Sequence, residues 1–181
     1  VEGVESERDG ARSTMPCDGV VFTGKFKPEA ALVEASPLML DDSTGGPAID
    51  SAWRCSDPRF FAAGNVLRPI EHSGWVAAEG KSAAQAILRA LNGALPPVGA
   101  AIPLRAEGAL LYAYPQRLLP DDGAIAVFAR AAFARKGVLR LIADGQTLAT
   151  RRVNALPERR LSLTFPAERL RGKRDVVMTL D

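Results

Sequence analysis

The sequence predicts two folded units of different class: an α/β segment over residues 1–95, and a small all-β antiparallel sandwich or barrel over residues 104–181. A length of 181 residues is sufficient for two compact domains. In the first half, short apolar runs alternate with helical patterns, whereas the second half alternates strands with turns. Between them, residues 96–103 begin with Pro96-Pro97 and end at Pro103, which is typical of a linker.

The first half opens with a predicted hairpin. Residues 1–8 alternate like a strand, an Asp-Gly dipeptide supplies the turn, and residues 12–15 form the returning strand. Residues 19–22 are a short continuous apolar run, typical of a buried parallel strand. Residues 28–33 predict a short helix with proline near its start, where the missing N–H costs least.

A second apolar strand is predicted at residues 59–63, followed by a long helix from about residue 74 to residue 91. The helix is rich in alanine and glycine, so it could approach a sheet or a flat ligand closely. Simple packing of helix on sheet explains the small residues equally well. Asn92-Gly93 ends the helix, with Gly93 suited to a left-handed cap.

The second half contains six predicted strands separated by turn dipeptides such as Asp144-Gly145. Tyr112, Tyr114, Phe128 and Phe133 are expected in the core of the sandwich. The predicted strands cover residues 109–114, 124–134, 137–143, 146–153, 160–165 and 174–180.

Composition argues against several function classes. Cys17 and Cys55 form no CxxC pair and the chain has one histidine, so no metal site is expected and a reduced, cytoplasmic setting fits best. No apolar run approaches the roughly 20 residues that span a bilayer. Residues 100–181 carry 14 basic and 8 acidic residues, but the arginines recur singly and without a set of stacking aromatics. We therefore expect a solvated sheet face and no nucleic-acid partner.

Two short segments of the first half resemble sequence motifs of a known enzyme family. Residues 18–24 (DGVVFTG) and residues 60–65 (FFAAGN) resemble the paired closing motifs of FAD-dependent pyridine nucleotide-disulfide oxidoreductases. The resemblance covers roughly residues 1–92 and implies the C-terminal part of a Rossmann-like FAD-binding domain. In that family the first motif ends in a small residue and a glycine, here Thr23 and Gly24. The second ends in Gly-Asp at the flavin, here Gly64 and Asn65, so asparagine stands where the family has the carboxylate that reaches a ribityl hydroxyl.

The resemblance also implies that the following loop and helix start lie against the pyrimidine end of the flavin, where backbone N–H groups and the helix dipole favour negative charge. Val66, Gly74 and Trp75 are therefore further candidate cofactor contacts. Glu71 and His72 are the polar groups expected nearest the flavin and are candidate catalytic residues. For His72, a surface or helix-capping role is the alternative.

The chain lacks a GxGxxG fingerprint for a dinucleotide pyrophosphate. In the family this fingerprint precedes the segment seen here, so we expect a C-terminal portion that is inactive alone and is completed by the upstream part of the same flavoprotein or by a partner subunit. The absent cysteine pair favours an amine- or imine-oxidising branch, such as the flavoprotein subunits of opine oxidase and hydrogen cyanide synthase.

The expected function is to complete an FAD site and support hydride transfer from NAD(P)H or an amine or imine substrate. Homo-oligomerisation would be compatible with this function. The alternative is a non-catalytic binding or scaffolding protein, with a relic flavin fold and a β interaction module.

Overall fold

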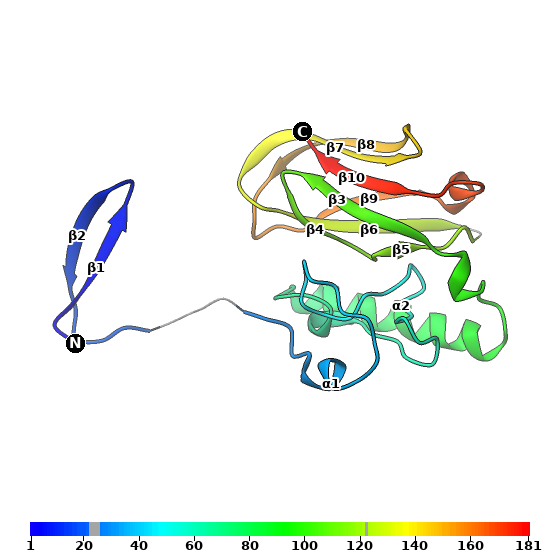
Figure 1. Ribbon diagram of the computed structural model, residues 1–181, viewed down its shortest axis with the longest axis horizontal. Helices are drawn as coiled ribbons and strands as arrows, with labels where there is room; N and C mark the ends of the chain where they lie inside the picture. The colour runs from blue at the N-terminus through cyan, green and yellow to red at the C-terminus, as the bar shows by residue number, and fades with distance from the viewer. Residues whose placement is uncertain (22–25, 122) are drawn as a thin grey trace.

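The computed structural model describes residues 1–21, 26–121 and 123–181. In Figure 1 a small hairpin lies apart from a layered body, in which two β-sheets are stacked on a layer of loops and one long helix. The predicted β-rich half is therefore confirmed, whereas the described part of residues 1–95 does not show the expected Rossmann-like α/β segment.

The hairpin consists of β1 (Gly3–Arg8) and β2 (Ala11–Pro16), paired antiparallel. Asp9 and Gly10 between them have positive φ angles of 53° and 79°, as a two-residue turn that matches the twist of the strands requires. The hairpin predicted from the Asp-Gly dipeptide is thus confirmed. Almost every residue of both strands is exposed.

The long helix predicted at residues 74–91 is α2 (Ser73–Leu91). His72 caps its start, since its Nδ1 accepts a hydrogen bond from the Gly74 N–H (3.1 Å). Gly93 follows its end with a φ of 66°, as the predicted left-handed cap requires. The helix predicted at residues 28–33 is only the four-residue α1 (Ala31–Glu34), and short 3-10 turns occur at Gly64–Val66 (η1) and Val98–Ala100 (η2).

The two apolar strands expected in the first half, at residues 19–22 and 59–63, are the main correction. Residues 19–21 belong to no strand and Val21 is 88% exposed, while residues 22–25 lie outside the described part of the chain. Within residues 59–63 only one isolated bridge forms, from Phe61 to Arg54, and Phe60 is half exposed. An apolar run becomes a sheet strand only beside a hydrogen-bonding neighbour, and the described residues supply none here.

All six strands predicted beyond residue 108 form, and two further ones, β3 and β5, were not predicted. Their bounds are β3 (Ile102–Gly108), β4 (Leu110–Tyr114), β5 (Arg117–Leu118), β6 (Ala124–Ala131), β7 (Arg135–Ala143), β8 (Gln146–Ala155), β9 (Leu161–Pro166) and β10 (Val176–Leu180), with a 3-10 turn η3 (Ala167–Leu170) before β10. Within the described residues they form a five-stranded sheet in the order β5-β3-β10-β7-β8 and a three-stranded sheet in the order β4-β6-β9. Pairing is antiparallel except between β10 and β3, which run parallel.

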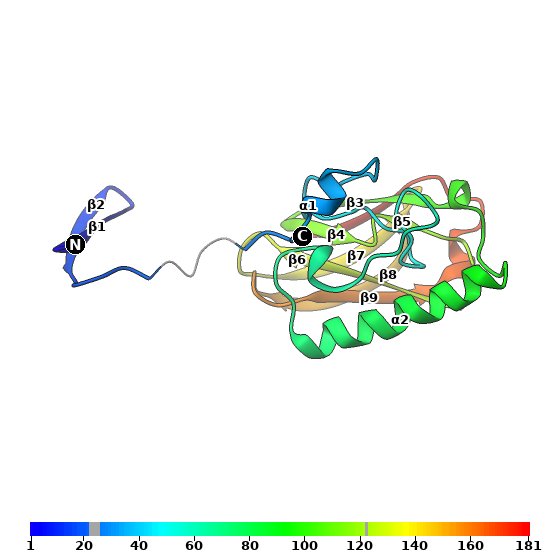
Figure 2. The same cartoon turned by 90° about the horizontal axis from the view of Figure 1, so that it is seen from below.

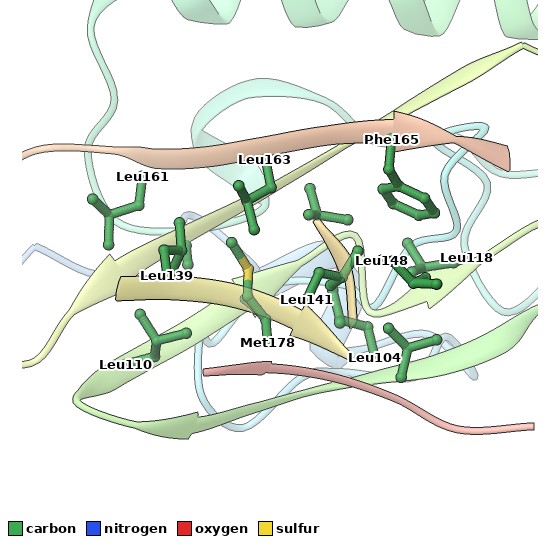
Figure 3. Close-up of a cluster of buried hydrophobic side chains, with 14 of the residues drawn as sticks. Leu104, Leu110, Leu118, Leu139, Leu141, Leu148, Leu161, Leu163, Phe165 and Met178 are labelled. Atoms are coloured by element: carbon green, nitrogen blue, oxygen red, sulfur yellow. The ribbon is translucent and has the colours of Figure 1, made fainter. Parts of the chain in front are cut away.

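The two sheets enclose one apolar core (Figure 3). Leu139, Leu141 and Met178 from the larger sheet meet Leu163 and Phe165 from the smaller one, all nearly inaccessible. Strand alternation explains this arrangement, because every second side chain of β7, β9 and β10 points inward. This core is the sandwich that the alternating sequence predicted.

The aromatic residues expected in this core lie elsewhere. Tyr112 and Tyr114 are 3% and 2% exposed but belong to the opposite face of β4 from Leu110 and Ala113, while Phe133 is 53% exposed. The outer face of the three-stranded sheet is therefore also covered.

Its cover is the third layer, which comprises α2 and the chain between residues 47 and 71 (Figure 2). Backbone and side chains join this layer to the strands: the Ile49 N–H donates to Gln116 Oε1 (3.0 Å), and the Leu119 N–H donates to Ser51 Oγ (2.9 Å). Arg54 also donates to the carbonyl of Pro96 in the linker (2.8 Å). No helix in the described residues has the length and apolarity that crossing a membrane requires.

Candidate functional site

Five charged side chains are buried where α2 meets the three-stranded sheet, and we call them the ionic cluster. Arg68 and Glu71 precede α2, Glu79 lies on its buried face, Arg130 is in β6, and Arg160 precedes β9. Their side chains are between 0% and 10% exposed. Charges buried this deeply require partners, because desolvation alone would destabilise the fold.

Glu79 is the centre of the ionic cluster. Its Oε1 accepts from Arg68 Nη2 (2.6 Å), Arg160 Nη1 (2.9 Å) and the Tyr114 hydroxyl (3.3 Å). Its Oε2 accepts from Arg68 Nη1 and from the Gly64 N–H, both at 3.1 Å. One carboxylate therefore ties the turn at Gly64, the helix α2 and the sandwich together.

Glu71 is the second carboxylate of the cluster. It lies 3.2 Å from Arg130 Nη2, 3.4 Å from Arg68 Nη2 and 3.8 Å from Arg160 Nε. Its backbone N–H donates to Asn65 Oδ1 (2.9 Å). The candidate catalytic residue Glu71 is thus an ion-pair partner, and Asn65 fixes its backbone.

Aromatic rings flank the guanidinium groups. Arg68 lies over the ring of Tyr114, 4.2 Å from its centroid, and Arg160 lies between Trp75 (4.0 Å) and Phe128 (4.4 Å). Burial raises the pKa of the Tyr114 phenol well above its usual value, although Arg68 opposes this. The neutral Tyr114 hydroxyl donates a hydrogen bond to Glu79, accepts one from Arg160 Nη1, and adds no charge to the cluster at neutral pH.

A surface cleft of about 550 Å³ opens beside the cluster. The start of α2 forms one wall, and β6, β9 and the turn before β9 form the other. Its lining residues are Glu71, His72, Trp75, Phe128, Glu158, Arg159, Arg160, Ser162 and Thr164.

Of the residues predicted at the second motif, Gly64 is buried with a φ of 80°, while Asn65 is exposed and Val66 half-buried. A Cβ built on Gly64 would lie 3.0 Å from Val76 Cγ1, so this turn packs directly on the first turn of α2. Thr23 and Gly24 lie outside the described residues.

Of the residues predicted at the helix start, Gly74 and Trp75 are exposed, and Trp75 lines the cleft. His72 lines it as well, and its Nδ1 caps α2. The structure therefore brings Gly64, Asn65, His72 and Trp75 to one end of α2.

Sequence reasoning missed Arg130 and Arg160, which it assigned to a solvated sheet face, and it missed Glu79. One signal was present: Glu79 shares a face of α2 with the buried Ala83 and Ala86. A single acidic residue on an otherwise small apolar face indicates a buried partner of opposite charge.

Comparison with protein-family models, with curated proteins and with solved structures gave no match for this chain. Among the residues that the structure describes, no group of three or more His, Cys, Asp or Glu side chains could hold a metal ion.

Proposed function

We propose that this chain is the C-terminal part of an FAD-dependent oxidoreductase of the pyridine nucleotide-disulfide type, where it completes the flavin site and supports hydride transfer. The observation that carries the proposal is the direct packing of the Gly64 turn on the start of α2, with Glu79 binding the Gly64 N–H. A glycine at positive φ beside a helix N-terminus offers close backbone approach and a favourable dipole to a flat, electron-accepting ring.

Asn65 fits the ribityl contact in a specific way. Its Oδ1 is occupied by the Glu71 N–H (2.9 Å), and the side chain is otherwise exposed. The amide nitrogen of Asn65 is left to donate to a ribityl hydroxyl oxygen. Asparagine at this position would therefore bind as a donor where a carboxylate would bind as an acceptor.

The exposed face of α2 supports the idea that further protein completes the site. Leu88 is 61% exposed, Leu91 78% and Phe60 49%, beside a groove of about 650 Å³. Large apolar side chains in one patch are typical of a surface that another protein element covers. We assign this cover to the remainder of a Rossmann-like FAD-binding domain, supplied by the same flavoprotein or by a partner subunit.

The remaining features of the proposal follow the resemblance. NAD(P)H or an amine or imine substrate would supply the hydride, as in the opine oxidase and hydrogen cyanide synthase branch, in a cytoplasmic protein that could also form homo-oligomers. The sandwich would support the site mechanically, since Tyr114, Arg130 and Arg160 hold the loop and helix that carry it.

A visible absorption spectrum of the full-length protein, recorded before and after anaerobic addition of NADH or NADPH, tests the proposal. A flavin band is expected, and its bleaching identifies the electron donor. A colourless protein that takes up no FAD on incubation would refute the flavoprotein assignment.

Substitution of Asn65 sharpens this test. Asn65→Asp keeps an acceptor for the Glu71 N–H and adds a charge-assisted hydrogen bond to the flavin, so FAD affinity should rise about tenfold, equivalent to about 1.4 kcal/mol. Asn154→Asp, at an exposed position of β8, is the matched control and should leave FAD affinity unchanged.

The second candidate function is a non-catalytic scaffold with a relic flavin fold. The observation favouring it is that two expected flavin contacts are satisfied within the protein: Asn65 Oδ1 by Glu71 and the Gly74 N–H by His72. A protein that stays colourless, and in which Asn65→Asp changes no FAD affinity, would support this reading.

A further inference from the structure

The ionic cluster carries one more positive charge than negative. Its three guanidinium groups (Arg68, Arg130, Arg160) face two carboxylates (Glu71, Glu79). The nearby Tyr114 is held in its neutral form by burial, which raises its pKa. Arginine keeps its proton in proteins, so the excess charge persists at all ordinary pH values.

The cluster also has more hydrogen-bond donors than acceptors. Arg68 Nε and Arg130 Nε are buried without a hydrogen-bond partner among the described residues. Both nitrogens are sealed from solvent, so neither reaches a ligand in the cleft; what they show is that the described residues do not fully compensate the guanidinium groups.

Arg160 connects this charge to the cleft. Its side chain is 8% exposed and lines the cleft, its Nη1 donates to Glu79 and Tyr114, and its Nε lies against Glu71. Its Nη2 makes no hydrogen bond within the described part of the chain and, unlike Nε of Arg68 and Arg130, is not sealed from solvent. The adjacent Glu158 and Arg159 of the lining are both exposed and offset one another in charge.

We propose that this cleft binds a small organic monoanion, a carboxylate attached to a flat apolar or aromatic body, with Arg160 Nη2 donating to the carboxylate. A single uncompensated charge matches a monoanion better than a phosphate dianion. Trp75 and Phe128 line the same cleft and give apolar contact area for the body beside the faces that Arg160 covers, while Ser162 and Thr164 add hydroxyl donors. A volume of about 550 Å³ is within the range that small-molecule sites occupy.

The binding test uses calorimetric titration of the 181-residue chain with benzoate, benzamide and inorganic phosphate at constant ionic strength, without flavin. Benzoate is expected to bind at one site, at least tenfold more tightly than the uncharged benzamide and more tightly than phosphate. Equal affinities for benzoate and benzamide, tighter binding of phosphate, or no benzoate binding at about 20 mM would each overturn the proposal.

Two variants locate the site. Arg160→Lys keeps the charge but removes the planar fork and should weaken benzoate binding at least tenfold. Because Arg160 also stabilises the fold, the second variant, Thr164→Glu, adds a negative charge to the cleft wall at an exposed position of β9 and should abolish binding.

Thr150→Glu, at an exposed position of β8 outside the lining, is the matched control and should bind as the parent does. Unchanged benzoate affinity in Thr164→Glu would place the anion elsewhere and refute the assignment. Since no flavin enters the experiment, its outcome is independent of the proposed oxidoreductase function.

Discussion

Replacing Glu79 by glutamine should destabilise the protein more than any surface substitution, because one carboxylate accepts hydrogen bonds from five donor groups of four residues. The side chain is 4% exposed and accepts hydrogen bonds from Gly64, Arg68, Tyr114 and Arg160. Glutamine has nearly the same volume, so packing is preserved. The substitution removes the central negative charge and turns an amide donor toward guanidinium groups.

The magnitude follows from burial. Removing one partner of a buried ion pair costs about 3–5 kcal/mol, since the remaining charge stays desolvated without compensation. Glu79→Gln leaves three buried guanidinium groups facing one carboxylate. For a chain of this size, each kcal/mol lowers Tm by roughly 2–4 °C, so Tm should fall by roughly 6–20 °C.

Urea unfolding followed by far-UV circular dichroism and tryptophan fluorescence measures the loss directly. Trp75 stacks on Arg160, which binds Glu79, so its fluorescence reports the cluster itself. Glu107→Gln is the matched control: Glu107 is half-exposed in a pair with Arg105, and its loss should cost less than about 0.5 kcal/mol. A loss below about 1 kcal/mol in Glu79→Gln would refute the reasoning that the cluster holds the layers together.

Three further predictions concern single positions. Gly64→Ala should lower the free energy of unfolding in urea by about 1–3 kcal/mol, because the φ of Gly64 is 80° and a Cβ would meet Val76 of α2 at 3.0 Å. Gly80→Ala, at a position of α2 with open space around it, should raise the free energy of unfolding by about 1 kcal/mol. Equal effects of the two substitutions would contradict the strain argument. With Ellman's reagent, one thiol should react quickly and the second only in denaturant, since Cys55 is 1% exposed and burial raises its pKa, while Cys17 is partly accessible; two fast thiols would be inconsistent with this burial. Absorbance at 295 nm should show the phenol of Tyr114 still protonated above pH 10 in the folded chain, because burial raises its pKa. The unfolded chain loses this proton near pH 10, so the free energy of unfolding should fall as the pH rises above about 10. Smooth ionisation of Tyr114 at about pH 10 without unfolding would argue against this burial.

The sequence alone predicted the elements whose causes are local. The β1–β2 hairpin follows from an Asp-Gly turn between alternating residues, and α2 follows from its helical period, from glycine after its end and from good helix formers within it. Six of the strands from β4 to β10 were predicted because segments of alternating apolar and polar residues are separated by turn dipeptides. The two-residue β5, and β3 at the end of the predicted linker, were not predicted. In each case neighbours in sequence supply most of the determining interactions.

Tertiary structure alone decided which apolar runs became strands and which charges were buried. Residues 59–63 have a strand's composition, yet the described chain offers them no neighbouring strand beyond one isolated bridge. Arg160 looks like a surface residue in sequence, but its partner Glu79 lies 81 positions away and reaches it only after α2 packs on the sandwich. Sequence patterns record the propensity of a segment, whereas pairing across such distances depends on which surfaces the assembled layers bring together.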